Sequence, residues 1–247
     1  MRDFDRQNKP GFVLAFLQAR MGSTRLPGKV LMRIRGKSIL ERAILRLRAA
    51  RAIDDVAVLT TCLREDNAVA EEAARLGARS YRGPELDVLR RFQEASETFR
   101  PDIVVRATAD NPLIDIGSVD RIVEGLRAGN LDLCMESELP YGAATEACTA
   151  EALAKAHRFA RDIRDREHVT LYIKEHREEF CVSYLTPPEH LRRPQIRVTV
   201  DTAEDFMLMD RLIGSLEEGN APRPLGEYLP LAQAMMDERE CKALTLS

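Results

Sequence analysis

Glycine and basic residues are concentrated in one short stretch near the N-terminus, QARMGSTRLPGKVL, at residues 18–31. Gly22 and Gly28 favour a turn that exposes backbone N–H groups, while Arg20, Arg25 and Lys29 add positive charge. Backbone donors together with fixed cations are what a triphosphate needs. The stretch therefore predicts a site for a small polyanion, in which Arg20 and Lys29 neutralise a triphosphate and Arg25 either assists or pairs with an acid.

This stretch is not a P-loop, which follows the pattern G-x-x-x-x-G-K-[ST]. Five residues separate Gly22 from Gly28, where the P-loop has four, and Val30 stands where a Ser or Thr would hold magnesium. No helix is predicted to begin at Val30. The spacing therefore disfavours a P-loop kinase or ATPase and indicates another way of holding a nucleotide.

Two carboxylates that follow predicted strands are candidates for binding Mg²⁺, which proteins usually hold through one or two carboxylates plus substrate oxygens. Asp110 follows IVVRATA and Asp201 follows IRVTV. If both strands run parallel to the first strand, both carboxylates reach the sheet edge that carries the basic loop. Simpler roles are also open: Asp110 as the cap of a turn before Pro112, and Asp201 as the N-cap of a helix. The basic loop at the same edge favours the metal.

Apolar runs and amphipathic patterns alternate through the first half of the chain. Ser38 and Glu41 predict a capping box at the start of the first helix. The predicted strands are 12–17, 56–61, 78–81, 102–108 and 131–135, and the predicted helices begin near 38 and cover 66–76, 87–99 and 118–128. This order predicts an α/β fold with a doubly wound, mostly parallel sheet. About 20 residues join the first strand to the first helix, against the usual 2–6, and their content favours a functional loop.

The second half of the chain departs from this alternation. Its predicted elements are helices at about 150–160 and 165–178, strands 181–186 and 195–200, a helix at 202–216, and a C-terminal helix over LGEYLPLAQAMM. No internal repeat or clear linker is present. We expect one domain over residues 1–247, with a polar leader at 1–11 and a helical and β arm at about 140–195.

The composition, 45% hydrophobic and 31% charged, is that of a globular protein. No apolar run approaches the ~18 residues of a membrane span, and the N-terminus lacks a signal-peptide core. The five cysteines show no C-x-x-C spacing, which indicates reduced thiols and a cytoplasmic protein. Residues 18–51 contain ten Lys or Arg and one acid, although the net charge is −3. This local charge favours a small anion over nucleic acid, and the arginines at 42–51 are interpreted as the solvated face of a helix.

The stretch QARMGSTRLPGKVL resembles the signature loop of sugar-activating nucleotidyltransferases. It is most similar to the cytidylyltransferases that include the KDO and acylneuraminate enzymes and the spore-coat polysaccharide type. Later blocks of the spore-coat type follow in the same order, and they are RGPELDVLRRF (82–92), VVRATADNPLID (104–115), PYGAATEA (140–147), REHVTLYI (166–173) and VTVDTAEDF (198–206). The resemblance covers most of residues 12–206 and implies a sheet of the nucleotide-diphospho-sugar transferase type.

The resemblance implies a Mg²⁺-dependent enzyme that transfers CMP from CTP to a sugar or sugar acid for surface polysaccharide, with release of pyrophosphate. Arg20, Lys29 and Asp110 are the catalytic candidates, and Asp110 and Asp201 the metal ligands. The nucleotide-binding candidates are Leu17, Gln18, Ala19, Arg20, Gly22, Ser23, Arg25, Lys29, Thr61, Arg82 and Asp87. The choice of CTP over UTP or ATP rests on the resemblance alone, and the sequence does not fix the sugar.

The acceptor candidates are Tyr141, Gly142, Glu146 and His168, and the resemblance implies that the arm forms a homodimer. Simpler roles stay open for several of these residues. Asp87 qualifies as an N-cap, a lone helical histidine such as His168 is more often a packing or surface residue, and apolar residues of the arm can simply cover the sheet.

Two alternative functions remain. Ala109 stands where the family usually has Gly before the metal-binding Asp, so an inactive nucleotide-binding relative is one of them. A glycosyltransferase of similar sheet architecture is the other. That class normally carries a D-x-D pair at a strand end, whereas here the pattern occurs as Asp3-Phe4-Asp5 in the polar leader, which disfavours it.

Overall fold

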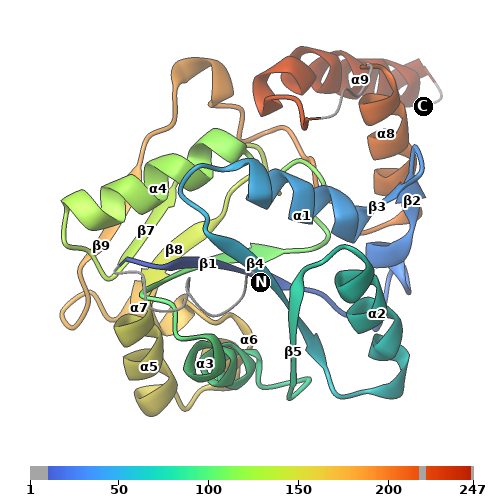
Figure 1. Cartoon of the computed structure of the whole chain (residues 1–247). Coiled ribbons are helices and arrows are strands. Elements are labelled where there is room, and N and C mark those ends of the chain that lie inside the picture. The colour runs from blue at the N-terminus through green and yellow to red at the C-terminus, as the bar shows by residue number, and fades with distance from the viewer. Residues whose placement is uncertain (1–10, 217–220, 246–247) are drawn as a thin grey trace.

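The computed structural model describes residues 11–216 and 221–245, and a seven-stranded sheet forms its centre (Figure 1). The strands are β1 (Val13–Gln18), β4 (Asp55–Thr61), β5 (Arg79–Gly83), β6 (Ile103–Thr108), β7 (Leu133–Glu136), β8 (Glu146–Thr149) and β9 (Val182–Leu185). Their order is β5-β4-β1-β6-β8-β7-β9, with β8 antiparallel to both neighbours and the other neighbouring strands parallel. The predicted mostly parallel sheet is confirmed.

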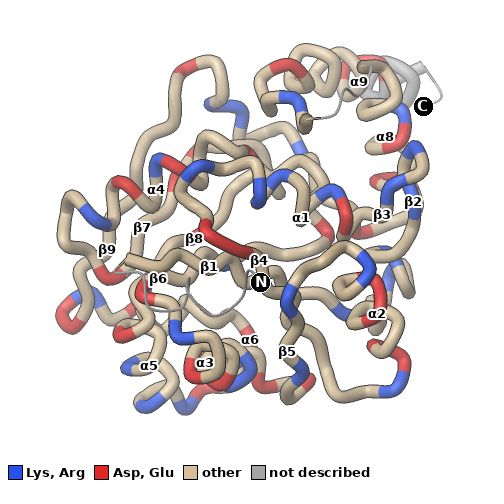
Figure 2. Tube along the Cα trace, in the orientation of Figure 1, with Lys and Arg blue, Asp and Glu red and all other residues tan. Residues whose placement is uncertain are grey.

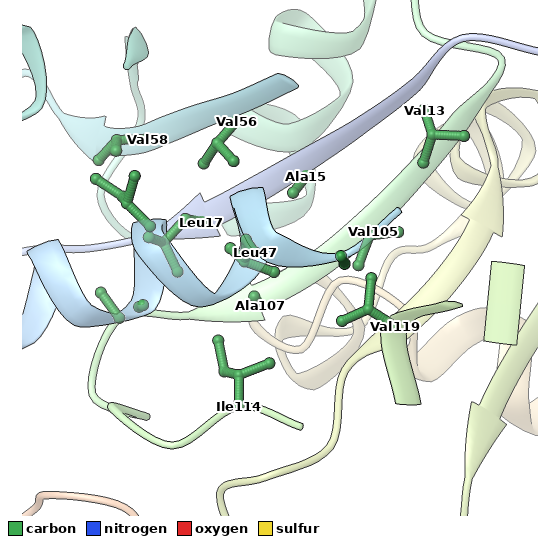
Figure 3. Close-up of a cluster of buried hydrophobic side chains, with 14 of the residues drawn as sticks. Val13, Ala15, Leu17, Leu47, Val56, Val58, Val105, Ala107, Ile114 and Val119 are labelled. Atoms are coloured by element: carbon green, nitrogen blue, oxygen red, sulfur yellow. The ribbon is translucent and has the colours of Figure 1, made fainter. Parts of the chain in front are cut away.

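Helices cover both faces of this sheet (Figure 1). One face carries α1 (Ile39–Ala49), α2 (Asn67–Arg75) and α4 (Ile116–Ala128), and the other carries α3 (Val88–Phe99), α5 (Ala150–Phe159), α6 (Ile163–Glu167) and α7 (Leu171–Glu175). Residues of β1 alternate between the two layers because successive strand side chains point to opposite faces. Leu17 joins the cluster under α1, where Figure 3 shows it near Leu47 and Val58, whereas Phe16 joins the cluster under α3.

A third apolar cluster lies beside the sheet, where the hairpin of β2 (Arg33–Ile34) and β3 (Lys37–Ser38) meets α8 (Ala203–Gly214) and α9 (Leu225–Thr245). Short 3₁₀ helices lie at η1 (Lys29–Leu31), η2 (Arg64–Asp66) and η3 (Glu189–Leu191). Thr202 and Asp205 form a capping box at the start of α8. Thus Thr202, and not Asp201, is the N-cap of this helix.

The predicted strand at 195–200 is wrong, because this segment is not part of the main sheet. It forms a single isolated parallel bridge, between Tyr141 and Arg197. Its alternation of apolar residues is nevertheless real, since Ile196, Val198 and Val200 are buried in the third cluster. The segment pairs with loops instead of a neighbouring strand.

Two further predictions are corrected. The expected helix at 165–178 is broken into α6 and α7, because Val169 has a φ of +53° and places a fully buried side chain in the core under α3 and α5. No strand was predicted between residues 135 and 150, but Glu146 begins β8, a strand inside the sheet.

The arginines of α1 are only partly a solvated face. Arg48 and Arg51 are exposed, but Arg42 and Arg46 are buried. Arg42 donates to the Ile34 carbonyl, and Arg46 donates to the carbonyls of Ile114 and Arg223. These two guanidinium groups satisfy carbonyls of β2 and of two loops inside the molecule, which the sequence interpretation did not anticipate.

Charged residues otherwise lie mainly on the helices and loops around the sheet, whose strands are mostly uncharged (Figure 2). The four described cysteines, Cys62, Cys134, Cys148 and Cys181, are free thiols. Among the described helices, none has the length and apolar character required to cross a membrane. The predicted leader, with its Asp3-Phe4-Asp5 pattern, lies outside the described residues apart from Gly11.

Candidate active site

The basic loop begins where β1 ends, and the buried side chain of Asp66 anchors it through a hydrogen bond. Asp66 accepts a hydrogen bond from the Met21 backbone N–H at 2.6 Å and another from the Thr61 hydroxyl. Gly28, with a φ of +72°, turns the chain so that its N–H donates to the Met21 carbonyl at 2.9 Å. Lys29, the next residue, begins η1.

Lys29 brings together the two carboxylates predicted for the site. Its ammonium lies 3.0 Å from Asp110 Oδ2, 2.7 Å from Asp201 Oδ1 and 2.7 Å from the Val200 carbonyl oxygen. These three bonds use all three donors of a lysine ammonium. Because Lys29 is only 7% exposed, this contact is a buried cross-link between three distant parts of the chain.

Backbone hydrogen bonds explain how Asp201 reaches Asp110 without a strand. Asp110 lies in the turn at the end of β6, and its carbonyl accepts from the Val200 N–H at 2.9 Å and from the Thr199 hydroxyl at 3.3 Å. The segment that precedes Asp201 is thereby fixed against the sheet edge. The prediction that both carboxylates arrive at one edge holds in the structure, although the route for Asp201 differs.

Asp201 is surrounded by positive charge. Besides Lys29, Arg25 lies 3.2 Å from its Oδ2, and Arg197 donates to the same oxygen. Burial would raise the pKa of Asp201, but the bonds and charges of Lys29, Arg197 and Arg25 outweigh it and hold this pKa below its ordinary value. Asp205 accepts from the Asp201 backbone N–H at 2.9 Å and fixes the start of α8.

A pocket of about 270 Å³ opens between the loop and the end of β6. Its lining residues are Gln18, Ala19, Arg20, Gly22, Ser23, Thr24, Arg25, Lys29, Val30, Thr108, Ala109 and Asp110. Most of the predicted nucleotide residues from the loop therefore share one cavity with a predicted metal ligand. Arg20 lies at its rim, half-exposed, and pairs with Glu85 at 3.2 Å. Leu17 is fully buried in the cluster under α1 and does not line this pocket.

Three other nucleotide candidates have structural partners instead of lining this pocket. Thr61 is buried against Asp66. Arg82 donates to the carbonyls of Thr61 and Leu63, and so secures the turn after β4. Asp87 caps α3 by accepting from the Arg90 N–H, which confirms the simpler role considered for it. Arg82 also lines a separate hollow with Cys62, Leu63, Gly83, Pro84, Glu85 and Glu94.

Of the acceptor candidates, Tyr141 and Gly142 pack directly against the segment that carries Asp201. Tyr141 exchanges backbone hydrogen bonds with Ile196 and Val198, both at 2.8 Å, and its ring lies 4.9 Å from the Arg197 guanidinium carbon. Tyr141 is 62% exposed, so the rest of its ring is free to meet a ligand. Gly142 has a φ of +97°, and a side chain there would collide with Thr199.

The structure does not bring Glu146 and His168 to this pocket. Glu146 is buried in β8, where it accepts from Arg106 at 3.1 Å and from Lys174 and Thr170. Burial would raise the pKa of Glu146, but the charges of Arg106 and Lys174 lower it to about 2. His168 is an exposed residue at the end of α6.

The carboxylates at this site fit a divalent cation by the chemistry of their donor atoms. Asp110 and Asp201 both contact the single nitrogen of Lys29, so one small cation can lie close to both. Within the described residues, no group of three or more His, Cys, Asp and Glu forms a metal site. A cation that takes one or two carboxylates and completes its shell with substrate oxygens and water, as Mg²⁺ does, suits this arrangement.

Ala109 causes no backbone distortion in this structure. Among the described residues, Ala109 is not one of the non-glycine residues with a positive φ. Its N–H donates to the Gln18 carbonyl at 2.9 Å. Its side chain is 1% exposed and belongs to the cluster under α1. The backbone at this position therefore adopts a conformation that alanine accommodates.

The sequence interpretation did not assign to the site Asp66, which anchors the loop, or Arg197, which contacts Asp201, and it also left out the pocket-lining residues Thr24, Val30 and Thr108. Asp66 was assigned only to the start of a helix, since nothing in the sequence signals a bond to a loop 45 residues away. Arg197 lies four residues before Asp201 within an apparent strand, where period-2 spacing puts both on one face. This shared face was the signal in the sequence that could have placed Arg197 beside Asp201.

The fold and the site together define an enzyme of the nucleotidyltransferase class. A family model described as Cytidylyltransferase matches residues 14–239, and the chain belongs to this family. This assignment does not support the glycosyltransferase alternative.

Two relatives and one solved structure illustrate the similarity. An uncharacterised protein of Methanocaldococcus jannaschii is 43% identical over 196 residues, which are 79% of this chain and 81% of the relative. The spore coat polysaccharide biosynthesis protein SpsF of Bacillus subtilis is 34% identical over 199 residues, 78% of this chain and 83% of SpsF. The structure of a cytidylyltransferase from Leptospira borgpetersenii superposes with a TM-score of 0.81 at 27% identity, covering 92% of this chain and 94% of that one.

Proposed function

We propose that this enzyme transfers CMP from CTP to a hydroxyl group of a sugar or sugar acid, with Mg²⁺ as cofactor, in the synthesis of a surface polysaccharide. The observation that carries the proposal is the position of Lys29. It joins Asp110 and Asp201 directly under a basic loop that opens into a pocket. Membership of the cytidylyltransferase family supports the nucleotide, and the similarity to SpsF supports the polysaccharide.

In the proposed reaction, an oxygen of the sugar attacks the α-phosphorus of CTP in line with the bond to the β-phosphate. The new P–O bond forms as the bond to pyrophosphate breaks, and the hydroxyl proton passes to solvent. Negative charge on the phosphoryl oxygens must be neutralised throughout. The loop N–H groups, Arg20 and Arg25 hold the β- and γ-phosphates, and Lys29 adds a further positive charge in the same pocket.

Asp110 and Asp201 would hold the Mg²⁺, which when bound supplies charge neutralisation at the reacting phosphate. The backbone at 17–19, which ends β1, is the proposed contact for the nucleoside. Tyr141 and Gly142 are the proposed acceptor contacts, because they adjoin the Asp201 segment. By the same family likeness we propose that the arm at about 140–195 forms a homodimer and that the enzyme works in the cytoplasm.

Pyrophosphate release tests this function. Each of the four nucleoside triphosphates is incubated with the enzyme, Mg²⁺ and a panel of sugar acids. Asp110→Asn and Asp201→Asn are measured alongside, with Asp237→Asn, an exposed residue of α9, as the matched control. Release with CTP and one sugar, lost in the two site variants and kept in the control, is the expected result. Release that survives both site substitutions would contradict the metal assignment.

A further inference from the structure

The carboxylates proposed to hold Mg²⁺ are already bonded to cations of the chain itself. Both oxygens of Asp201 have such partners: Oδ1 accepts from Lys29, and Oδ2 contacts Arg25 and Arg197. Asp110 Oδ2 also accepts from Lys29. A divalent ion that enters this site therefore finds both oxygens of Asp201 and Oδ2 of Asp110 already bonded to cations of the chain.

The charge around these residues is also balanced. Asp110, Asp201 and Asp205 face Lys29, Arg25 and Arg197, and Arg197 lies 3.4 Å from an oxygen of Asp205. Three carboxylates and three cations give this cluster no net formal charge, so it attracts a further positive ion less than two unpaired carboxylates would. Because Lys29 and Asp201 are largely buried, solvent screens these interactions only weakly.

A bound triphosphate changes both the bonding of these carboxylates and the charge balance around them. Lys29 and Arg25 line the pocket proposed for the nucleotide, and the Arg25 side chain is 64% exposed, so it can turn without unpacking the core. Phosphate oxygens compete with the carboxylates for these two cations and bring several negative charges to the site. Arg197 lies outside the residues that line the pocket and can keep Asp201 oriented through Oδ2.

We infer, on the basis of the proposed function, that Lys29 and Arg25 close the metal site in the nucleotide-free enzyme. Binding of a nucleoside triphosphate draws them off Asp110 and Asp201 and so assembles the site. Metal and nucleotide then bind with positive coupling, and the coupling is reciprocal by linkage. The enzyme would discriminate against free divalent ions and load them together with the triphosphate.

A simpler role for Lys29 is that of a permanent cross-brace. The two roles differ in what removal of the lysine does to metal binding. If Lys29 is only a brace, Lys29→Met separates the carboxylates and affinity for a divalent ion stays low. If Lys29 closes the site, the same substitution frees two neighbouring carboxylates and creates affinity for a divalent ion in the absence of nucleotide.

The experiment is a titration of the nucleotide-free protein with Mn²⁺, followed by the electron paramagnetic resonance of the free ion. We expect negligible binding to the wild type and at least about tenfold tighter binding to Lys29→Met. The gain should vanish in the double variant with Asp110→Asn. Lys155→Met is the matched control, because it removes a lysine from a single carboxylate, Glu179, on the arm, and it should not differ from wild type.

Arg25→Met keeps the test decisive if Lys29→Met does not fold. Arg25 is a surface residue, and its removal should give a smaller gain, about threefold, in the same titration. Mn²⁺ binding to nucleotide-free wild type as tight as to the variants would overturn the inference, as would no gain in either folded variant.

The coupling itself is measured by calorimetry of CTP with and without Mn²⁺. CTP should bind at least about tenfold more tightly with the metal, and equal affinity would also overturn the inference. If the wild type binds no CTP under either condition, the proposed function fails, while the gain of Mn²⁺ affinity in the variants still reports on the closure by Lys29 and Arg25.

Discussion

The carboxylate of Asp66 accepts the backbone N–H of Met21 at 2.6 Å and so anchors the basic loop to the segment that follows β4. Asp66 is fully buried and also accepts from the Thr61 hydroxyl. A loop of glycines and exposed arginines would otherwise have few contacts to fix its shape. The geometry of the proposed phosphate site thus depends on an acid that contacts no substrate.

Asp66→Ala should weaken both folding and nucleotide binding. The substitution leaves two buried donors without an acceptor, so we expect a loss of about 2–3 kcal/mol in the free energy of unfolding. The freed loop should raise the KM for CTP by about tenfold. Urea denaturation and steady-state kinetics measure the two effects, and Asp66→Asn, which retains one oxygen, should lose less in each. Unchanged values in Asp66→Ala would show that the loop is fixed elsewhere.

Gly142→Ala should destabilise the protein more than Gly36→Ala. Both glycines have positive φ, +97° and +82°, so each alanine incurs a backbone strain of about 1–2 kcal/mol. Only at Gly142 does the new methyl group also collide, 2.8 Å from Thr199 Cβ and 2.9 Å from its backbone nitrogen, whereas Gly36 has no atom within 4 Å. Thermal unfolding should show a drop for Gly142→Ala that is larger by about 1–3 kcal/mol. Equal drops would rule out this tight packing.

Glu146 should contribute to stability in a pH-dependent way. Its pKa of about 2 lies below the ordinary value of 4.5, because Arg106 and Lys174 outweigh the effect of burial. A depressed pKa gives a contribution that is fully present above pH 4.5 and is lost as the pH falls toward 2. We expect Glu146→Gln to be less stable than wild type by roughly 3 kcal/mol at pH 7, with the gap closing below pH 4.5. A gap that stays constant down to pH 3 would contradict the shift.

Tyr141→Ala should raise the KM for the acceptor by about tenfold and leave the KM for CTP unchanged, since the exposed ring is the proposed acceptor contact. Tyr141→Phe should behave like wild type. Tyr184 is the matched control, because it is also exposed and stacks on an arginine, with Arg177 at 5.1 Å, but lies on β9. An equal effect of Tyr141→Ala and Tyr184→Ala on the acceptor KM would remove Tyr141 from the proposed site.

The sequence predicted the parts of the site that depend on local pattern. The buried run at 12–17 and the cap at Ser38 define where the long loop begins and ends, and the structure places them at Val13–Gln18 and at the start of α1. Ser38 accepts from the Glu41 N–H as a cap should. Asp110 follows its strand closely enough that parallel pairing alone brings it beside the loop.

The predictions that were wrong concern contacts between segments that lie far apart in the sequence. Period-2 alternation at 195–200 was read as a sheet strand, although the same alternation buries Val198 and Val200 against α8 and α9. Periodicity gave no sign that Val169 would adopt a left-handed conformation, since β-branched residues rarely do. Glu146 was assigned to the acceptor from its block alone, while its partners Arg106 and Lys174 lie 40 and 28 residues away.

The most direct test of the central claim is the product formed from CTP. Purified enzyme is incubated with CTP, Mg²⁺ and the sugar-acid panel, and the mixture is analysed by mass spectrometry for a CMP-linked sugar, with Asp110→Asn in parallel. The proposed function predicts one CMP-sugar and an equal amount of pyrophosphate, both lost in the variant. A CMP-sugar formed equally by Asp110→Asn, or a nucleotide product that carries no sugar, would contradict it.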